Sequence, residues 1–263
     1  MVLRIISLGA GVQSTTMALM AAHGETGPMP DCAIFADTQG EPKAVYDHLA
    51  WLMSPNVLPF PVHVVTAGNL WESAVKVRAK RDGTGTYIAT ALPVFMDERG
   101  KFGMAMRACT RDFKITPIVR KAREILGRSG TAEMWVGIST DEAARMKPAR
   151  QKWIKTRWPL IERRMSRGDC LQWLKRNGYP NPPKSACTFC PFHSDDAWKS
   201  LTGAEFADAV AKEREMQAAY ANATSIRGVP YLHSSRRPLD TVVLDGTNQL
   251  NMFNNECEGM CGV

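Results

Sequence analysis

Short apolar runs alternate with helical patterns over the first part of this 263-residue chain. Apolar runs cover 3–7, 32–36 and 62–65, and the two stretches between them, 14–22 and 42–52, have apolar residues at helical spacing. Strands that alternate with helices form a parallel sheet with helices on both faces. The pattern therefore predicts a doubly wound α/β fold, whose ligands bind at the carboxyl ends of the strands.

The middle of the chain is less regular. Residues 80–103 have no clear period and contain several Gly and Pro residues, so we expect an excursion that is either a lid or a disordered insertion. Regular patterns return as a helix at 113–126 and a strand at 134–138. We therefore expect the main nucleotide-binding domain to cover residues 1–165.

A smaller lobe is expected at residues 166–263. A short helical pattern at 170–177 ends at a glycine and is followed by three prolines. Thr202 and Glu205 have the spacing of a capping box, which predicts a helix that runs to about residue 221.

The chain is basic, with a formal net charge of +7 and a pI near 9.1. Many of its Lys and Arg residues lie between Arg107 and Arg176, and such a field attracts polyanions. Trp153 and Trp158 interrupt this region and could stack on nucleic-acid bases, or they could pack inward beneath an ordinary solvated surface.

The chain has seven cysteines. An odd number in a chain of this length is more typical of reduced thiols than of a secreted disulfide framework. No apolar run reaches the roughly 18 residues of a membrane span, and the apolar start is interrupted by Arg4, which does not fit a signal peptide. We expect a cytoplasmic protein without membrane contact. Cys32, in an apolar run, is expected in the core.

A glycine-rich loop follows the first apolar run and opens the first helix. Such a loop brings backbone N–H groups to a phosphate, although an ordinary strand–helix turn would have the same composition. The candidate nucleotide-binding residues here are Ser7, Gly9, Ala10, Gly11, Gln13, Ser14 and Thr15.

Polar residues also follow the second predicted strand. Asp37, Thr38 and Glu41 lie at the same expected edge of the sheet, where they could hold a ribose hydroxyl or Mg²⁺. Helix capping is the alternative for these residues.

Cys187 and Cys190 are separated by two residues and followed by a proline. This spacing lets two thiolates bind one metal ion or one iron–sulfur cluster. A structural zinc site is the alternative to a cluster.

Four segments together resemble the PP-loop ATPases, the adenine nucleotide alpha-hydrolase-like superfamily, which includes phosphoadenosine phosphosulfate reductases and nucleic-acid thiolation enzymes. They are 9–15, similar to the family's pyrophosphate loop, 35–38 and 107–114, similar to the reductase branch, and 137–145, similar to the thiolation enzymes. The family loop usually reads Ser-Gly-Gly-x-Asp-Ser, so Gly9, Ala10 and Gln13 depart from it.

The resemblance implies that ATP or a related adenylate binds with Mg²⁺, and that Gly137 contributes to the nucleotide site. Arg107, Lys114 and Arg145 would then neutralise charge on the phosphates. It also implies a [4Fe–4S] cluster on Cys109, Cys187 and Cys190, with Zn²⁺ as the alternative. The fourth position would be open or supplied by one of several candidates, namely Cys170, His193, Cys257 and Cys261.

The C-terminal segment 256–262 partly resembles the Glu-Cys-Gly segment whose thiolate attacks sulfur in assimilatory reductases. Cys257 or Cys261 could therefore be a nucleophile or a cluster ligand. The function implied is sulfur transfer, with a nucleic acid as one candidate substrate, or phosphosulfate-type reduction, served by a sulfur or electron donor protein. The alternative is a non-catalytic nucleic-acid-binding module with a structural zinc site.

Overall fold

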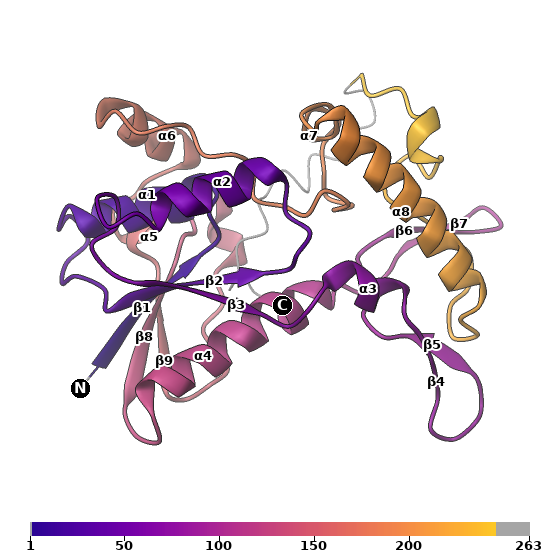
Figure 1. The fold of residues 1–263 in the computed structure, drawn as a ribbon, viewed down its shortest axis with the longest axis horizontal. Helices are drawn as coiled ribbons and strands as arrows, with labels where there is room; N and C mark the ends of the chain where they lie inside the picture. Colours follow the sequence, from indigo (N-terminus) through magenta and orange to yellow (C-terminus); the bar gives the residue numbers. More distant parts are fainter. Residues whose placement is uncertain (1, 246–263) are drawn as a thin grey trace.

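The structure, a computed structural model, describes residues 2–245 (Figure 1). Its strands are β1 (Val2–Leu8), β2 (Cys32–Asp37), β3 (Val62–Thr66), β4 (Val77–Ala79), β5 (Thr86–Ile88), β6 (Phe95–Glu98), β7 (Lys101–Met104), β8 (Thr131–Val136), β9 (Ile154–Arg157) and β10 (Val229–Tyr231). Its α-helices are α1 (Val12–Ala22), α2 (Lys43–Leu52), α3 (Leu70–Val75), α4 (Thr116–Leu126), α5 (Pro159–Glu162), α6 (Arg167–Arg176), α7 (Asp195–Lys199) and α8 (Gly203–Ala221). A π-helical turn η1 (Thr110–Ile115) precedes α4, and two 3₁₀ helices are η2 (Thr140–Arg145) and η3 (Leu239–Thr241).

The predicted α/β fold is confirmed by a five-stranded sheet of order β3-β2-β1-β8-β9, in which every neighbouring pair is parallel. The chain moves outward from β1 to β2 and β3, and then returns to the other side of β1 at β8. The order therefore reverses between β1 and β8. Ligands of open α/β sheets bind at such a reversal, beyond the carboxyl ends of the strands.

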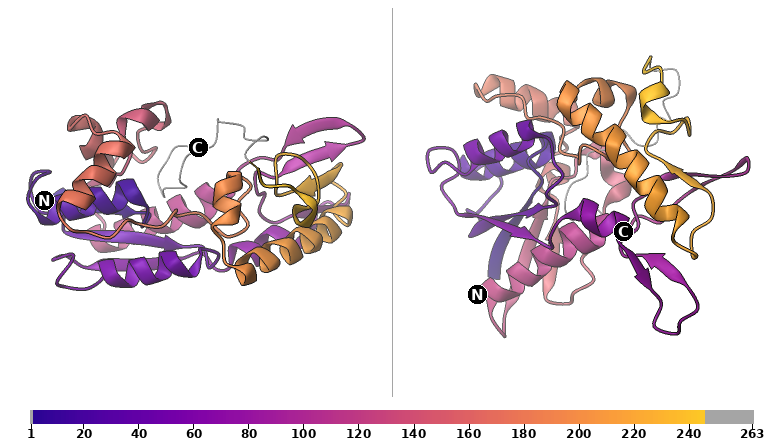
Figure 2. Two further views of the ribbon diagram at one scale, coloured as in Figure 1. Left: turned by 90° about the horizontal axis from the view of Figure 1, so that it is seen from above. Right: turned by 45° about the vertical axis from the view of Figure 1, so that its right-hand side comes forward.

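Helices cover both faces of this sheet, as Figures 1 and 2 show. Alternate residues of a strand face opposite sides, so Ile6 packs with α1, α2 and α6, whereas Ile5 packs with α4. Both isoleucines have no exposed surface. The two layers of apolar side chains hold the strand ends, and the loops that follow them, in fixed positions.

The expectation of an irregular excursion at residues 80–103 is wrong. This region contains β5, β6 and β7, which belong to two small antiparallel sheets, β4-β5 and β10-β6-β7. Each strand has only three or four residues, too few to display a period of two. Contacts with residues far away in the sequence stabilise these short strands, and a local sequence pattern does not reveal such contacts. Thr86, for example, donates from its hydroxyl to the carbonyl of Asn222 at 2.8 Å.

The apolar cores do not divide at residue 165, where we placed the domain boundary. Helix α6 lies after that position, yet Cys170, Trp173 and Leu174 pack in the core beneath α1. A separate core combines α3 and residues 92–113 with residues 187–239. This separate core is thus built from two stretches of chain, whose magenta and orange elements lie at the right of Figure 1.

Candidate functional site

The loops after β1 and β8 meet at the point where the strand order reverses. Gln13, in the first turn of α1, donates from its side-chain amide to Ser139 Oγ at 3.4 Å. Arg167 donates to the amide oxygen of Gln13 at 3.0 Å, which adds the N-terminus of α6 to this junction. Gln13 therefore joins the predicted glycine-rich loop to the segment after Gly137.

The glycine-rich loop has the backbone shape of a tight turn into a helix. Ala10 has a φ of +59°, a left-handed conformation that costs a side-chain-bearing residue roughly 1–2 kcal/mol. Gly11 is the N-cap of α1 and contributes no side chain to capping. The N–H of Gly9 donates to Ser14 Oγ at 3.2 Å. This geometry suits the approach of an anion to the start of α1.

Thr15, a predicted loop residue, lies in the first turn of α1, and its two donors serve the protein interior. Its N–H donates to the carbonyl of Gly11 at 2.9 Å. Its hydroxyl lies 3.0 Å from Nε2 of His48, on α2. Burial lowers the pKa of His48 to about 4, so the ring is neutral near pH 7 and can accept this hydrogen bond. Thr15 thereby links α1 to α2.

The second predicted nucleotide loop begins at Asp37, whose Oδ1 accepts from the N–H of Gln39 at 2.7 Å and from the hydroxyl of Tyr46 at 2.8 Å. Burial, followed by this hydrogen bond and the charge of Asp37, raises the pKa of Tyr46, which keeps the phenol protonated as a donor. These two hydrogen bonds hold the Asp37 side chain in place at the end of β2. Glu41 is instead fully buried and pairs with Lys114, with Nζ and Oε1 3.1 Å apart.

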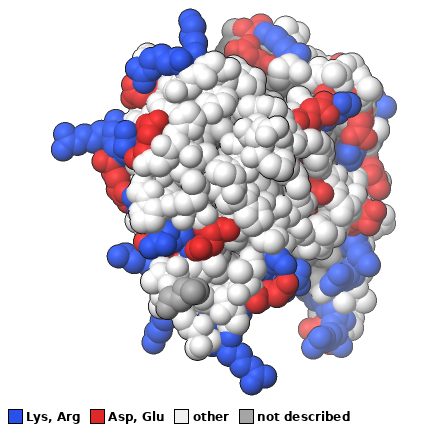
Figure 3. Space-filling view, turned by 60° about the vertical axis from the view of Figure 1, so that its left-hand side comes forward, with Lys and Arg blue, Asp and Glu red and all other residues white. Residues whose placement is uncertain are grey.

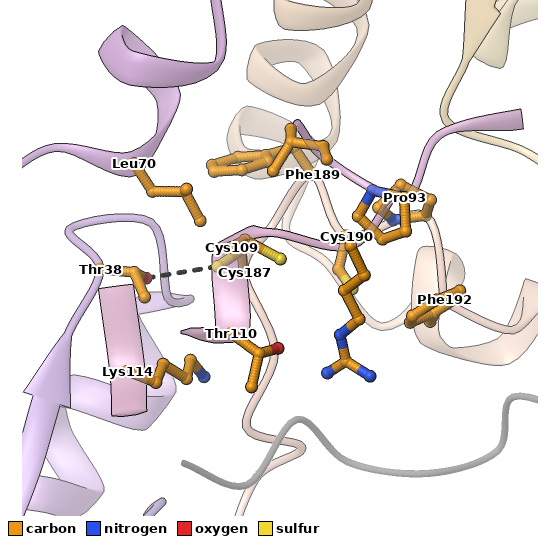
Figure 4. A pocket seen from close by; sticks show the side chains of 13 residues that line it. Thr38, Leu70, Pro93, Cys109, Thr110, Lys114, Cys187, Phe189, Cys190 and Phe192 are labelled. Carbon is orange, nitrogen blue, oxygen red and sulfur yellow. Dashed lines mark hydrogen bonds between the residues drawn. The ribbon is translucent and has the colours of Figure 1, made fainter. Parts of the chain in front are cut away.

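Three predicted thiol ligands line one pocket (Figure 4). Cys109 immediately precedes η1, whereas Cys187 and Cys190 lie on the loop before α7. The other walls are largely apolar, with Arg107 and Lys114 as the cationic members. The remaining lining residues are Thr38, Leu70, Leu92, Pro93, Thr110, Phe189, Pro191 and Phe192. The fold therefore brings Cys109 to a pair of cysteines that follow it by 78 and 81 positions.

Cys187 is the most buried of the three thiols. Burial and the nearby Glu41 carboxylate raise its pKa well above the ordinary value, and Cys190 adds to this effect. The Lys114 ammonium and the hydrogen bond with Thr38 act in the opposite direction. Without a bound cation, Cys187 is consequently a neutral thiol near pH 7. A soft metal ion would favour the thiolate, which is the form that binds metal.

The cysteine segment is attached to both predicted nucleotide loops. The hydroxyl of Ser185 donates to the carbonyl of Gly9, and the N–H of Thr188 donates to the carbonyl of Gly40 at 2.8 Å. Thr38 Oγ1 lies 3.3 Å from Cys187 Sγ. Gly40 also approaches the ring of Phe189 so closely that a Cβ there would lie 2.7 Å from it. The thiol pocket and the edge of the sheet are therefore one continuous structure.

The predicted cations occupy different surroundings. Arg107 lies with its guanidinium carbon 5.2 Å from the ring centre of Phe192, within the thiol pocket. Arg145 is the last residue of η2, which begins three residues after Gly137. Its guanidinium forms a largely buried ion pair with the Glu142 carboxylate, with an N–O distance of 2.6 Å. The segment that contains Gly137 and Arg145 follows the carboxyl end of β8, which ends at Val136 and not at residue 138 as the sequence predicts.

Of the candidates for a fourth ligand, the two in the described part of the chain do not line the thiol pocket. His193 donates from Nε2 to the carbonyl of Cys187 at 2.9 Å, and burial lowers its pKa to about 3. Cys170 lies in the core beneath α1. Cys257 and Cys261 lie outside the described residues. Within residues 2–245, no three His, Cys, Asp or Glu side chains already form a metal-binding group.

The basic stretch 107–176 is distributed over several elements. It includes β9, a strand of four residues that the sequence analysis did not predict. Trp153 and Trp158 pack partly buried against the core on the α4 side, and Arg123 lies 3.8 Å above the ring of Trp153. On the face that Figure 3 shows, Lys and Arg lie mainly around the margin, with Asp and Glu among them. The tryptophans thus follow the inward-packed alternative. No helix in the described residues has the length and apolar character needed to cross a membrane.

Sequence reasoning missed the residues that join the loops, above all Ser185, Gly40 and Tyr46. Ser185 lies two positions before Cys187, and this proximity to the cysteine pair is the signal that could have drawn attention to it. Gly40 and Tyr46 have no such signal in the sequence. The role of Gly40 depends on the distant ring of Phe189, and that of Tyr46 on a hydrogen bond to Asp37 at the end of β2.

Comparisons with known proteins give a similarity of fold. No protein-family model and no curated protein matches the chain. Among solved structures, the chain is similar to a phosphoadenylyl-sulfate (PAPS) reductase from Candida auris, determined as a phosphate complex. The alignment has 13% sequence identity and a TM-score of 0.42, and covers 69% of this chain and 74% of the reductase chain. A similarity of this size specifies neither ligand nor reaction, so the function must be inferred from the site.

Proposed function

We propose that this protein is an enzyme that binds ATP or a related adenylate and uses an iron–sulfur cluster in sulfur transfer or phosphosulfate-type reduction. The main support is the attachment of the cysteine segment to both loops at the sheet edge, through Ser185 to Gly9 and through Thr188 to Gly40. This attachment would hold a metal centre beside a nucleotide. A nucleotide-binding module with an unrelated zinc knuckle has no need of it.

The proposed nucleotide site extends along the carboxyl ends of β1, β2 and β8. Backbone N–H groups around Gly11 would meet the phosphates, since the partial positive charge of the α1 N-terminus lies there. Arg145 lies in η2, beyond β8, and would add charge to the phosphate side. Asp37 would contact a ribose hydroxyl or Mg²⁺. Gln13 stands where the family loop has aspartate, so we assign the carboxylate for a metal ion to Asp37, at the end of β2.

The donor set of the thiol pocket fits an iron–sulfur cluster. Cys109, Cys187 and Cys190 supply soft sulfur donors, and the apolar walls limit access of water. Arg107 and Lys114 would offset the negative charge of bound thiolates. Because the three thiols do not yet form a metal-binding group, their side chains would turn toward the bound cluster. When bound, a [4Fe–4S] cluster supplies an iron that can carry sulfur, or a centre that can pass electrons.

The residues of the pocket would position and isolate the reaction. Thr38, which directly follows β2, would donate to a Cys187 thiolate and so hold this ligand beside the nucleotide edge. Lys114 keeps its ammonium against Glu41 and within range of the Cys187 sulfur, where it favours the ionised ligand. Cys257 and Cys261 stay candidates for the fourth ligand or for a nucleophile.

Anaerobic purification followed by iron, zinc and absorbance measurements tests the metal centre. We expect brown protein with a broad visible band from thiolate-to-iron charge transfer. Cys187→Ser should lose the band and most of the iron, whereas Cys32→Ala, a change at a core cysteine outside the pocket, should keep both. Colourless protein with stoichiometric zinc would contradict the cluster and favour a structural zinc site.

Calorimetric titration with ATP and Mg²⁺ tests the nucleotide site separately. Gly11→Val adds a branched side chain where backbone amides are proposed to meet phosphate, so ATP affinity should fall at least about tenfold. Gly103→Val, in the exposed strand β7, should leave the affinity unchanged, because a Cβ at Gly103 meets no other atom within 4 Å. Equal ATP affinity in both variants, or no affinity in the parent protein, would contradict the loop assignment.

A further inference from the structure

The β4–β5 hairpin projects from the body of the molecule (Figures 1 and 2). Its strands pair antiparallel, with Arg78 opposite Tyr87 and Ala79 opposite Thr86. The turn closes through the N–H of Lys80, which donates to the carbonyl of Gly85 at 2.8 Å. Residues 80–88 fall in the region where the sequence predicts an irregular excursion, and the hairpin lies outside the basic stretch 107–176.

Cations gather on this hairpin. Between residues 76 and 88 the chain has four of them, Lys76, Arg78, Lys80 and Arg81, and one carboxylate, Asp82. Asp82 accepts from the N–H and the hydroxyl of Thr84 and so serves the turn. None of the four cations forms an ion pair with another described residue. Their charge is therefore directed outward.

The register places most of this charge on one face. Residues 76, 78 and 80 alternate along β4 and its ends, so Lys76, Arg78 and Lys80 share a face of the hairpin. Tyr87, 37% exposed, lies directly opposite Arg78 on that face. The other face has Val77 and Ile88, which are partly buried. The result is a narrow ribbon with a cationic side that includes a tyrosine hydroxyl.

The turn end of the hairpin is fixed to the segment that follows α8. Thr224 Oγ1 accepts from the N–H of Thr86 at 2.8 Å, and the N–H of Ser225 donates to the carbonyl of Thr86 at 3.0 Å. Gly85 packs so tightly here that a Cβ would lie 2.1 Å from Thr224 Oγ1. A ribbon held in this way keeps its cations in a fixed arrangement, which lowers the entropy cost of binding.

We propose that the β4–β5 hairpin binds double-stranded DNA along its major groove, with Lys76, Arg78 and Lys80 on the phosphates. The major groove is about 12 Å wide and admits a two-stranded β-ribbon. Alternate residues of a strand are about 6.7 Å apart, so three cations on one face follow a run of phosphates. Tyr87 donates a further hydrogen bond to the backbone. This surface is distinct from the thiol pocket, and its binding depends on neither nucleotide nor metal.

Fluorescence anisotropy with a 20-base-pair DNA duplex, and with one of its single strands, tests the proposal on the full chain without ATP. The parent protein should bind the duplex more tightly. Arg78→Gln/Lys80→Gln should weaken duplex binding at least tenfold at low salt. It should also reduce the slope of log affinity against log salt by about 2, since each phosphate contact contributes about 0.9. Lys152→Gln/Lys155→Gln removes the same charge from the basic stretch and should retain the slope.

Equal losses in the two double variants would overturn the proposal, because net charge alone would then explain binding. Preference for the single strand, or no binding by the parent, would also overturn it. Lysine modification of the unaltered protein gives a second measurement that does not depend on the stability of a variant. Duplex DNA should protect Lys76 and Lys80 from acetylation and leave Lys152 and Lys155 reactive. Equal modification with and without DNA would contradict the hairpin assignment.

Discussion

Thr38 Oγ1 lies 3.3 Å from Cys187 Sγ, so a residue at the end of β2 contacts a thiol that follows it by 149 positions. Both atoms are buried, and both residues line the thiol pocket (Figure 4). Ser185 makes the corresponding link to Gly9, after β1. Two hydroxyl groups thus join the metal-ligand candidates to the edge of the sheet where a nucleotide is proposed to bind.

Thr38→Val should make the Cys187 thiol less acidic. A hydroxyl that donates to a thiolate stabilises the ionised form, and its loss raises the pKa of Cys187 further above the ordinary value. At a fixed pH below that pKa the thiolate fraction falls. We expect alkylation of Cys187 by iodoacetamide in metal-free protein to slow about tenfold, since a hydrogen bond to a charged group contributes about 1.5–3 kcal/mol. Mass spectrometry of the Cys187 peptide over a pH series measures this rate.

Thr90→Val is the matched control, because it removes a buried hydroxyl that pairs with Ser73 instead of with a thiol. Its alkylation profile at Cys187 should match that of the parent. A Thr38→Val profile that also matches the parent would show that the contact does not influence the thiol.

Gly40→Ala should destabilise the protein and displace the cysteine turn. The added Cβ would lie 2.7 Å from the Phe189 ring and 3.6 Å from Cys187 Cβ. Phe189 is 1% exposed and packs edge-to-face on Trp71, with ring centres 4.9 Å apart, so the ring has little room to move. Overpacking of this kind costs about 1–3 kcal/mol, which urea unfolding can measure.

Gly203→Ala gives the comparison for this change. Gly203 begins α8, and a Cβ there meets no other atom within 4 Å, so its free energy of unfolding should stay the same or rise slightly. If both alanine variants unfold at the same urea concentration, the close packing of Gly40 against Phe189 has no energetic weight.

Lys114→Met should cost more than most surface changes. The Lys114–Glu41 pair is buried, with side-chain exposures of 7% and 0%, and Oε2 of Glu41 has no hydrogen-bond partner among the described residues. Removal of one partner from a buried pair typically costs about 3–5 kcal/mol, because a charge is left without compensation. Thermal or urea unfolding at pH 7 measures the loss.

The double variant Lys114→Met/Glu41→Gln distinguishes this effect from lost packing. It removes both charges, so it should recover a large part of the stability that Lys114→Met loses. A double variant that is as unstable as the sum of the single variants would show that the pair is not energetically coupled.

The regular elements that the sequence predicts are those with long and well-bounded patterns. β1, α1, β2, α2 and β3 lie within two residues of their expected ends because Gly and Pro residues mark the boundaries. The Thr202–Glu205 capping box of α8 is confirmed in both directions, with Thr202 accepting from the Glu205 N–H and the Glu205 carboxylate accepting from the Thr202 N–H. Local hydrogen bonds of this kind are visible in sequence spacing.

The links between the loops could not be predicted in this way. Ser185 and Gly9 are separated by 176 positions, and a serine hydroxyl has no sequence signature for a distant carbonyl. The assembly of Cys109 with Cys187 and Cys190 followed from the family resemblance, since spacing alone connects only the latter two. Similarly, the hairpins between α3 and η1 depend on contacts such as Thr86 with Thr224, which arise only after folding.

Acid should destabilise the protein through its buried histidines. Burial lowers the pKa of His48 to about 4 and that of His193 to about 3, whereas both would be near 6.5 in the unfolded chain. Between these values the unfolded state binds more protons, so the free energy of unfolding is fully retained above about pH 6.5 and falls as the pH drops toward 4. Each group contributes a slope of up to about 1.4 kcal/mol per pH unit. Urea unfolding at pH 7, 6 and 5 should show this decline.

The variant His48→Gln removes one of the two histidines, and the glutamine side-chain amide can still donate to or accept from the Thr15 hydroxyl. The free energy of unfolding of this variant should therefore decline less steeply over the same pH range. Parallel pH profiles for His48→Gln and the parent would show that His48 is not buried in its neutral form, and would remove the basis for the contact that joins α1 to α2.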